Sequence, residues 1–438
     1  MSPQNRGPAD PLALLASGEW IDPDHGTPCR FEMPAITIDD SLRGCEADLV
    51  AALDLGRRLA VVSDAMTHVV LGARIERALA PLARVDGIVL PGPAHADMPT
   101  VEAIRARCDG ADALIAVGSG TINDLAKFVA ARERKPYAVF ATAPSMNGYT
   151  SANAAITVNG HKKTLPATLA RGVFVDLSVC AAAPPRLIRA GLGDSLCRST
   201  AQVDWLLSHH LLGTDYRAAP FALLEGDEAA LLDQPEALLA GDLTAMRALA
   251  RTLLLSGIGM TLCGGSYPAS QGEHLISHCL DMRAPDGIPT ALHGEQVAVA
   301  TLTMARLQHV LLDAPAPRLR PTRVDETALK RHFGDDVGAA CWRDFSPKRL
   351  DEARAATLTE RLAAQWETLR ERARPAQVPV ERLAAVLRRA GAPVSCEDIG
   401  VGPEAWAAAV RHARFLRDRF TFLDLADDAG LLERRFLR

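Results

Sequence analysis

Short apolar runs alternate with amphipathic stretches through the first 180 residues or so of the chain. Residues 73–83 and 121–134 place apolar side chains at the 3.6-residue spacing of a helix. Around them lie short, partly β-branched runs bounded by turn residues, and each run predicts a buried strand: 59–63, 87–91, 113–117, 137–142 and 173–176. Strands that alternate with helices in this way predict a mostly parallel sheet covered on both faces.

The pattern changes after Pro184 and Pro185. From there on the chain is rich in Ala, Leu and Arg, and long amphipathic stretches such as 247–262 and 351–373 predict helices without a series of strands. We therefore expect three parts: an irregular lead-in over 1–35, an α/β domain over 36–185 and an all-α domain over 186–438. Two domains predict a cleft, and clefts between domains are favoured ligand sites.

Composition excludes several classes of protein. The 438 residues are 48% hydrophobic and 23% charged, and a net charge of −5 without a basic tract argues against nucleic-acid binding. No apolar run reaches the ~18 residues of a membrane span, and the first residues do not resemble a secretory signal. The nine cysteines occur without a CxxC pair, which argues against a disulfide framework and a thiolate zinc site. We expect a cytoplasmic globular protein with free thiols.

The turn Gly118-Ser119-Gly120 leads from a predicted strand into a predicted helix. Glycines there allow close backbone approach, and the N–H groups at Thr121 and Ile122 favour a phosphate at the helix N-terminus. Because the third glycine of a GxGxxG motif is absent, the segment is also compatible with an ordinary tight turn.

Two further features favour a nucleotide in this half. Asp64 ends a predicted strand, where a carboxylate can accept hydrogen bonds from a ribose; it would serve equally well as a helix N-cap. The segment 142–156 leaves another strand and carries hydroxyl and amide side chains, which are Thr142, Ser145, Asn147, Ser151 and Asn153. In a chain whose basic residues are mostly Arg, Lys127 and Lys163 follow these two segments. An ammonium group suits a phosphate or ribose oxygen, although chance placement explains the two lysines too.

Histidines in the second half predict a metal site. His274 and His278 are four residues apart and share one face of a helix, and His293 follows after a loop. Together with Asp194 the chain offers one carboxylate and imidazoles, which suit a divalent ion with open coordination positions. A histidine pair on a helix is also common without a metal, as His209 and His210 illustrate.

Taken together, these segments resemble the bacterial branch of the glycerol-1-phosphate dehydrogenase family, within the iron-containing alcohol dehydrogenase and dehydroquinate synthase-like superfamily. The resemblance spans roughly residues 35–430 and is carried, in order, by VVSDAMT, GSGTINDLAKF, TAPSMNGYTSANAAI, AGLGDSLCRSTAQVDW, PASQGEHLISH, ALHGEQVAVATL, LRRAGAPVSCEDIG and RFLRDRFTFLDLA. It implies an α/β domain for the dinucleotide, a helical domain, and an active site with a metal in the cleft.

The resemblance also implies roles for single residues. Asp194, His274 and His293 match the metal ligands, and His278 matches a histidine that contacts the substrate. Nicotinamide-cofactor contacts are matched by Asp64, Gly118, Ser119, Gly120, Thr121, Ile122, Asn123, Asp124, Thr142, Ser145 and Ser151.

Three positions depart from the family pattern. Asn147 stands where Asp is usual, so that the side chain can hydrogen-bond a substrate hydroxyl but cannot take a proton. Tyr267 replaces an Arg and removes a cationic fork, and Arg198 replaces a Lys. Two of these changes remove charges that could hold a phosphorylated polyol.

We expect hydride transfer between a nicotinamide cofactor, NAD or NADP, and a secondary alcohol of the glycerol-1-phosphate type. One divalent metal would polarise the alcohol oxygen; zinc suits the ligands, as do iron, nickel and manganese. The alternatives are another polyol or hydroxy compound as substrate, a dehydroquinate synthase-like lyase or cyclase, and a ligand-binding protein without activity. Apolar surface on the long helices could support a homodimer.

Overall fold

The computed structural model describes residues 10–92, 94–282 and 291–435, so that the first nine residues of the expected lead-in lie outside it. The chain forms two compact units. Unit 1 comprises residues 1–158, 163–195 and 217–266, and unit 2 comprises residues 159–162, 196–216 and 267–438. Within the described ranges, no helix is both long and apolar enough to cross a lipid bilayer.

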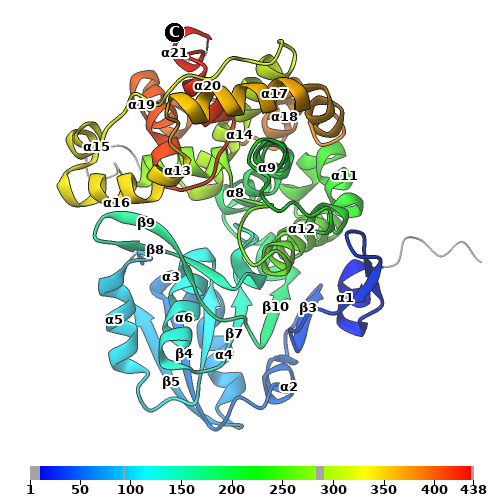
Figure 1. Ribbon diagram of the computed structural model, residues 1–438. Coiled ribbons are helices and arrows are strands. Elements are labelled where there is room, and N and C mark those ends of the chain that lie inside the picture. The colour runs from blue at the N-terminus through cyan, green and yellow to red at the C-terminus, as the bar shows by residue number, and fades with distance from the viewer. Residues whose placement is uncertain (1–9, 93, 283–290, 436–438) are drawn as a thin grey trace, which may run out of the picture. The chain divides into compact units, whose positions relative to one another are not determined.

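A six-stranded sheet forms the centre of unit 1 (Figure 1). Its strands lie in the order β3-β10-β7-β6-β4-β5, and every neighbouring pair is parallel. The five strands predicted from the sequence are all present: β4 (Arg58–Asp64), β5 (Arg84–Leu90), β6 (Ala113–Gly118), β7 (Tyr137–Ala141) and β10 (Gly172–Asp176). Every residue of β6 and β7 is buried, as expected of central strands with helices on both faces. The predicted parallel sheet is confirmed.

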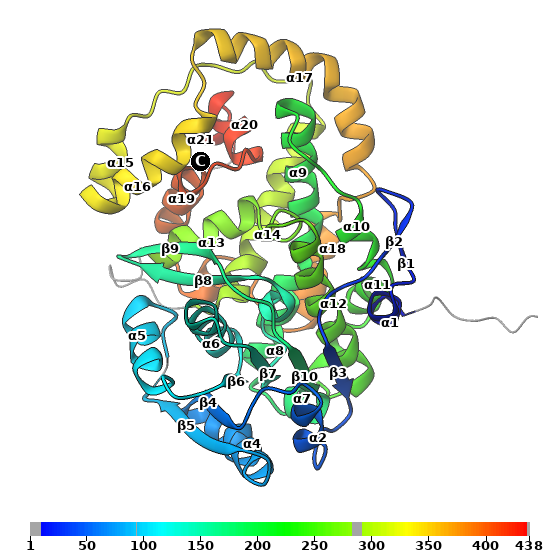
Figure 2. The same cartoon turned by 60° about the horizontal axis from the view of Figure 1, so that its bottom comes forward.

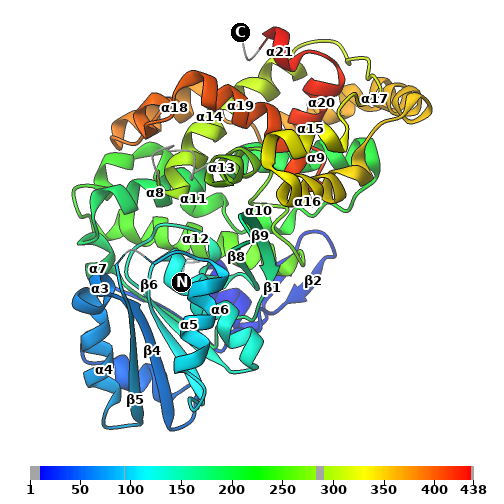
Figure 3. The same cartoon turned by 90° about the vertical axis from the view of Figure 1, so that its left-hand side faces the viewer.

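Helices lie on both faces of this sheet. On one side, α5 (Met98–Arg107) packs on α6 (Gly120–Glu133); on the other, α2 (Glu46–Ala51) packs on α4 (Ala73–Leu79). Figure 3 shows β4 and β5 between α4 and the pair α5 and α6. Because the carboxyl ends of parallel strands share one edge of the sheet, the turns that follow β4, β6 and β7 come together there.

Residues 11–39 are more regular than the expected lead-in. Helix α1 (Pro11–Ser17) is capped by Asp10, and β1 (Trp20–Asp22) pairs antiparallel with β2 (Thr27–Cys29). Strand β3 (Ala35–Asp39) then joins the edge of the sheet parallel to β10. The buried side chains of Leu15 and Trp20 give this segment an apolar core, which its many Pro and Gly residues obscure in the sequence.

A hairpin of β8 (Asn153–Val158) and β9 (His161–Pro166) was not expected either. Its turn residues Asn159 and Gly160 both have positive φ, at 50° and 76°. These values match a type I′ turn, for which Asn-Gly is the preferred pair.

In the described part of the chain no strand follows β10, so only helical elements and loops come after the predicted boundary near residue 185. The compact units divide the chain differently, because residues 217–266 group with the sheet. This segment holds α10 (Ala219–Ala222), α11 (Glu225–Asp233) and the predicted helix α12 (Leu243–Leu262). Helix α12 packs on α7 (Leu177–Ala181) and on the 3₁₀ turn η2 (Gly148–Thr150), which fixes it to the sheet side.

Unit 2 is a helical bundle around one large apolar core. Helix α13 (Gly272–Met282) packs on α14 (His293–Leu312) and α19 (Pro403–Ala413), and α9 (Arg198–Leu212) packs on α17 (Glu352–Ala373). Figure 2 shows α13 beside α14, with α17 at the rim of the unit. The other described helices are α15 (Glu326–Phe333), α16 (Asp335–Phe345), α18 (Val380–Arg389), α20 (Phe422–Asp428) and α21 (Leu432–Arg435).

Candidate functional site

The turn from β6 into α6 requires glycine at its first position. A Cβ atom on Gly118 would lie 2.5 Å from the Cβ atom of Ile122, closer than real Cβ atoms come. Ser119 is the N-cap of α6 and makes no side-chain capping bond. The helix ladder begins with the bond from Asn123 N to Ser119 O, so the N–H groups of the three preceding residues lie before it. With the positive end of the helix dipole, this turn suits an anion.

The polar loop that follows β7 is clamped by two helices of unit 1. A Cβ atom on Gly191 in α8 (Pro185–Leu196) would lie 1.7 Å from the carbonyl oxygen of Pro144. A Cβ atom on Gly257 in α12 would lie 2.5 Å from the carbonyl oxygen of Asn147. Glycines at both positions therefore let the helix backbones touch the loop backbone. The candidate cofactor contacts on this loop, Thr142, Ser145 and Ser151, are buried.

Asn147 joins this loop to Asp194. Its backbone N–H donates to Oδ2 of Asp194 over 2.9 Å, and its amide Nδ2 lies 3.4 Å from Oγ of Ser256. Asp194 is fully buried near the end of α8, and that helix continues by one residue into unit 2. The backbone bond does not depend on the side chain at position 147, so it holds with Asn as it would with Asp.

Lys127 is held by oxygen atoms of the protein. Its side chain is fully buried, and Nζ donates to the carbonyl oxygens of Gly148 and Asn153 over 2.6 and 2.9 Å. Oδ1 of Asp124 lies 3.5 Å from the same Nζ, while Oδ2 of Asp124 accepts from the backbone of Ala155. Burial lowers the pKa of Lys127 and Asp124 opposes that shift. The lysine thus fixes the polar loop and β8 to α6.

Asp64 is the N-cap of the short helix α3 (Ala65–Thr67). Its Oδ1 accepts from the backbone N–H of Thr67 over 2.7 Å, and Thr67 Oγ1 accepts from the backbone of Asp64 in return. Asp64 therefore acts as a helix N-cap, which is the alternative role that the sequence allowed for it. Asp64 and Lys163, which lies half-buried in β9, keep their cofactor-binding roles as predictions.

The three histidines predicted to act together do lie together in unit 2. His274 and His278 project from α13, and His293 is the first residue of α14. The ring centroids of His274 and His293 are 5.0 Å apart, and those of His278 and His293 are 5.8 Å apart. The side-by-side packing of α13 and α14 brings the rings to one place.

Hydrogen-bond partners fix the tautomers of His274 and His293. Nδ1 of His274 lies 3.0 Å from a carboxylate oxygen of Glu273, which can only accept, so Nδ1 carries the proton. Ser277 donates its hydroxyl hydrogen to Oε1 of Gln296 over 2.6 Å, and its oxygen therefore accepts from Nδ1 of His293 over 3.0 Å. In the neutral form of both rings Nε2 is then the unprotonated nitrogen, as a metal ligand requires.

His278 has the opposite tautomer. Arg417 can only donate, and its Nη2 lies 3.1 Å from Nδ1 of His278, so Nδ1 accepts and Nε2 carries the proton. Burial lowers the pKa of His278 well below 6.5, and the charge of Arg417 adds to the shift. The imidazole is thus neutral and presents an N–H group.

Glu273 belongs to a buried hydrogen-bonded group behind His274. Burial would raise its pKa, but His274 and backbone N–H groups bring the pKa below its ordinary value. Besides His274, Glu273 accepts from Thr200 and from the backbone of Gln271. Cys197 is near enough to share an ion with Glu273 and His274, but its thiol donates to a backbone carbonyl. The hydrogen bonds of Glu273 indicate that it supports His274.

Comparison with known proteins decides the family. The iron-containing alcohol dehydrogenase family model matches residues 38–184. Over 379 residues the chain is 31% identical to glycerol-1-phosphate dehydrogenase [NAD(P)+] of Bacillus subtilis, covering 85% of this chain and 86% of that protein. The enzyme of the same name from Geobacillus stearothermophilus is 32% identical over 328 residues, 74% of each chain. This chain belongs to the glycerol-1-phosphate dehydrogenase family. The resemblance seen in its motifs is confirmed, and the chain is an oxidoreductase.

Solved structures confirm the fold of this family member. A probable glycerol dehydrogenase from Sinorhizobium meliloti superimposes with a TM-score of 0.60 at 19% identity, covering 91% of this chain and 96% of that one. Maleylacetate reductase from a Rhizobium strain gives 0.60 at 18% identity, covering 93% and 97%. Both therefore combine an α/β part with a helical part like those described above.

The sequence patterns did not single out two arginines of this family member. Arg417 and Arg419 follow the 3₁₀ turn η7 (Arg414–Leu416), and both side chains reach Ser270, just before α13. The guanidinium carbon of Arg419 lies 4.5 Å from the ring centroid of Tyr267, the residue at which the resemblance led us to expect an Arg. The motif RFLRDRFTF contains both residues, but nothing in the sequence pairs them with positions 270 and 267.

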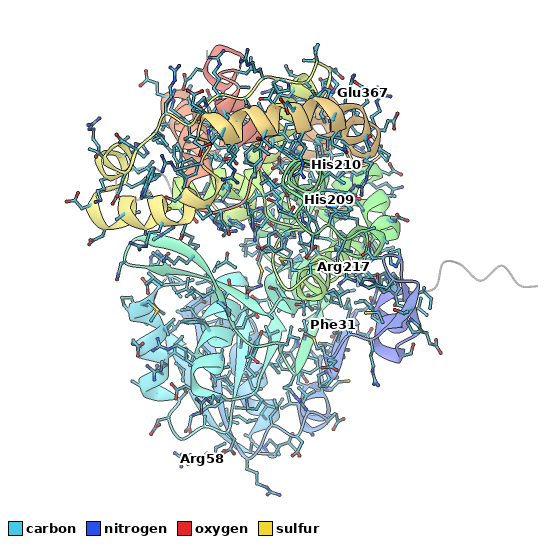
Figure 4. The ribbon with its side chains drawn as sticks, in the orientation of Figure 1. Phe31, Arg58, His209, His210, Arg217 and Glu367 are labelled. Carbon is cyan, nitrogen blue, oxygen red and sulfur yellow. The ribbon has the colours of Figure 1, made fainter. Side chains whose placement is uncertain are left out.

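The pair His209 and His210 contacts other residues of unit 2. Nδ1 of His209 lies 2.6 Å from the carbonyl oxygen of Thr214, and His210 contacts Gln365 and Arg372. Figure 4 shows both on α9. These contacts explain the two adjacent histidines by packing and hydrogen bonding, as the sequence analysis allowed for a histidine pair on a helix.

Proposed function

We propose that this chain interconverts glycerol-1-phosphate and dihydroxyacetone phosphate with NAD or NADP, at a site that holds one divalent metal. The observation that carries the proposal is the arrangement of the three histidines. Two present an unprotonated Nε2, and the third presents N–H. A set of two ligands and one hydrogen-bond donor is what a metal-assisted alcohol oxidation needs.

For the metal we propose the ligands Asp194, His274 and His293, which offer one carboxylate oxygen and two imidazole nitrogens. A divalent ion held there would lower the pKa of the substrate hydroxyl and, in the reverse direction, polarise the ketone. Zinc suits this ligand set, and iron, nickel and manganese suit it too. Glu273 and Ser277 orient the two imidazoles, which supports the choice of these ligands.

The cofactor is proposed to lie at the carboxyl ends of β4, β6 and β7. The N-terminus of α6 suits its pyrophosphate, and the residues Gly118 to Asp124, with Asp64, Thr142, Ser145, Ser151 and Lys163, are the proposed contacts. Lys127 acts by holding the loop that carries several of them. A nicotinamide ring bound there would exchange hydride with the substrate carbon.

His278 and Asn147 are proposed to contact the substrate. The N–H of His278 donates a hydrogen bond to a substrate oxygen, and Arg417 keeps the proton on that nitrogen. Asn147 can donate or accept a hydrogen bond through its amide but cannot move a proton. Because Nε2 of His278 already carries a proton and Nδ1 accepts from Arg417, this ring can hold the substrate oxygen but cannot take its proton, so proton transfer falls to solvent.

The proposal is tested by removing and restoring the metal. The purified protein is stripped with EDTA, reloaded with Zn²⁺, Fe²⁺, Ni²⁺ or Mn²⁺, and assayed for oxidation of NADH and NADPH with dihydroxyacetone phosphate. We expect activity to vanish on stripping and to return with at least one metal. His293→Ala should abolish the recovery, whereas His309→Ala, an exposed histidine on the same helix, should not. No turnover with any metal, or product without net nucleotide oxidation, contradicts the proposal.

Asn147 and Tyr267 favour a second candidate, a dehydrogenase of the same type for another polyol or hydroxy compound. The same assay on unphosphorylated polyols and hydroxy acids decides between the two. If the second candidate holds, the double variant Asn147→Asp with Tyr267→Arg should raise activity on dihydroxyacetone phosphate. Unchanged or lower activity speaks against it.

A further inference from the structure

Two arginines form one wall beside His278 in unit 2. Arg417 contacts Nδ1 of His278 over 3.1 Å and Oγ of Ser270 over 3.3 Å, and Arg419 donates to the carbonyl oxygen of Ser270. Both side chains are half-buried. The structure thus places the charge of Arg417 beside the ring of His278 and the charge of Arg419 near that of Arg417.

The charge at this wall is positive but not uniform. Burial, and then the neighbouring Arg419, lower the pKa of Arg417 to about 9, while Asp418, Asp344 and Glu273 oppose the shift. The guanidinium remains protonated at neutral pH. A phosphate dianion would find favourable charge here.

The segment that carries the arginines is held by a buried ionic cluster. Nζ of Lys348 donates to the carbonyl oxygen of Arg419 over 2.6 Å and contacts Oδ1 of Asp424 over 2.9 Å. Arg414, whose side chain is fully buried, contacts Asp424 over 3.0 Å and also pairs with Asp428. With its backbone held in this way, the guanidinium groups need little further ordering to bind a ligand.

Asp204 ties the same segment to the histidine helix. Its Oδ1 accepts from the backbone N–H of Phe422 over 2.9 Å, and its Oδ2 accepts from the backbone N–H of Gly272 over 3.0 Å. One side chain therefore fixes the start of α13 relative to the segment after Arg419. The distance from the arginines to His278 is set by this link.

Tyr267 packs against one of the two arginines. Its ring lies 5.9 Å from that of Trp205, centroid to centroid, and nearly parallel to it, and it offers its face to the guanidinium of Arg419. The tyrosine ring at this position thus stabilises a guanidinium group from a distant part of the chain.

We infer that Arg417 and Arg419 form the subsite for the phosphate group of the substrate. The inference rests on the proposed function, because it assigns an end of the phosphorylated polyol to named residues. It makes the two arginines determinants of specificity for phosphorylated over unphosphorylated substrates.

The test compares dihydroxyacetone phosphate with dihydroxyacetone in steady-state kinetics of the metal-loaded enzyme. For Arg419→Met we expect KM for dihydroxyacetone phosphate to rise about ten- to hundredfold, as for loss of a hydrogen bond between charged groups. The kinetics with dihydroxyacetone should change less than about threefold, a shift below 1 kcal/mol. Arg417→Lys keeps the charge and should lie between wild type and Arg419→Met. Arg388→Met, on the exposed side of α18, is the matched control for loss of one arginine.

A second measurement separates this inference from the proposed function. Calorimetric titration with inorganic phosphate needs no turnover; we expect wild type and Arg388→Met to bind it and Arg419→Met to bind it at least tenfold more weakly. Equal phosphate affinity in all three proteins overturns the inference. An enzyme that binds phosphate in this way but turns over no phosphorylated substrate overturns the proposed function alone. Thermal unfolding of each variant shows that the loss is not one of folding.

Discussion

The hydroxyl oxygen of Ser277 lies 3.0 Å from Nδ1 of His293, and its hydrogen is committed to Gln296. The serine can therefore only accept from the imidazole, and it fixes both the tautomer and the plane of the ring. Ser277 stands one residue before His278 on α13, so the helix that supplies two histidines also orients the third.

Replacing Ser277 with Ala should weaken metal binding without removing a proposed ligand. The imidazole of His293 loses its acceptor and can turn or take the other tautomer, and losses of this kind cost about ten- to hundredfold in metal affinity. Competition against a chromophoric zinc chelator measures the change. Thr303→Ala on α14, where the hydroxyl bonds only to its own helix, should leave the affinity unchanged. Equal affinity of Ser277→Ala and wild type would contradict the assigned tautomer.

Gly191→Ala should disturb the loop between β7 and η2. The new Cβ would lie 1.7 Å from the carbonyl oxygen of Pro144, a backbone atom that cannot swing aside. We expect the free energy of unfolding to fall by about 2–3 kcal/mol and the affinity for NADH to fall with it. Urea unfolding and fluorescence titration measure the two effects. Gly226→Ala on α11 meets no atom within 4 Å and should be neutral or stabilising by up to about 1 kcal/mol.

Lys127→Met tests whether this lysine acts on the fold or on the cofactor. Two carbonyl oxygens and a carboxylate lose their cation, so the free energy of unfolding should fall by about 3 kcal/mol. Lys330→Met removes a lysine that pairs with Glu326 at the surface of its helix, and should leave stability nearly unchanged. A higher KM for the cofactor at unchanged stability would instead place Lys127 on the nucleotide.

Asp176→Asn should change how stability depends on pH. Burial would raise the pKa of Asp176, but hydrogen bonds from Ser178 and Arg74 hold it below 3.8. In acid the unfolded chain takes up the proton first, so the wild type loses this contribution as pH falls below about 4. The variant should be less stable by about 2 kcal/mol at pH 6 to 7, and the difference should shrink below about pH 4. Urea unfolding across this pH range measures the difference in stability between variant and wild type. A difference that grows as the pH falls would contradict the prediction.

Local sequence determined the five predicted strands and the turn at Gly118, because their patterns depend on neighbours along the chain. The β8–β9 hairpin could have been found by the same means, since Asn159-Gly160 is a strong turn signal. Strand β3 is harder to see, because its residues are only half-buried at the sheet edge.

The arginines beside His278 cannot be predicted from local sequence patterns. Arg417 and His278 are 139 positions apart, and their contact follows from the packing of α13 on α19 and from the links through Asp204. The departure at Tyr267 therefore reads as a lost charge in the sequence, whereas the structure places the guanidinium of Arg419 over that ring. The tautomers of the histidines are also set by partners that no spacing rule identifies, apart from the adjacent Glu273.

The cluster around Arg414 also has a consequence for biosynthesis. Its acidic members and the two arginines of the wall are encoded more than a hundred codons after His274, so a ribosome making this chain exposes α13 well before they exist. Nascent chains would thus contain the three imidazoles before the arginine that contacts His278 is made.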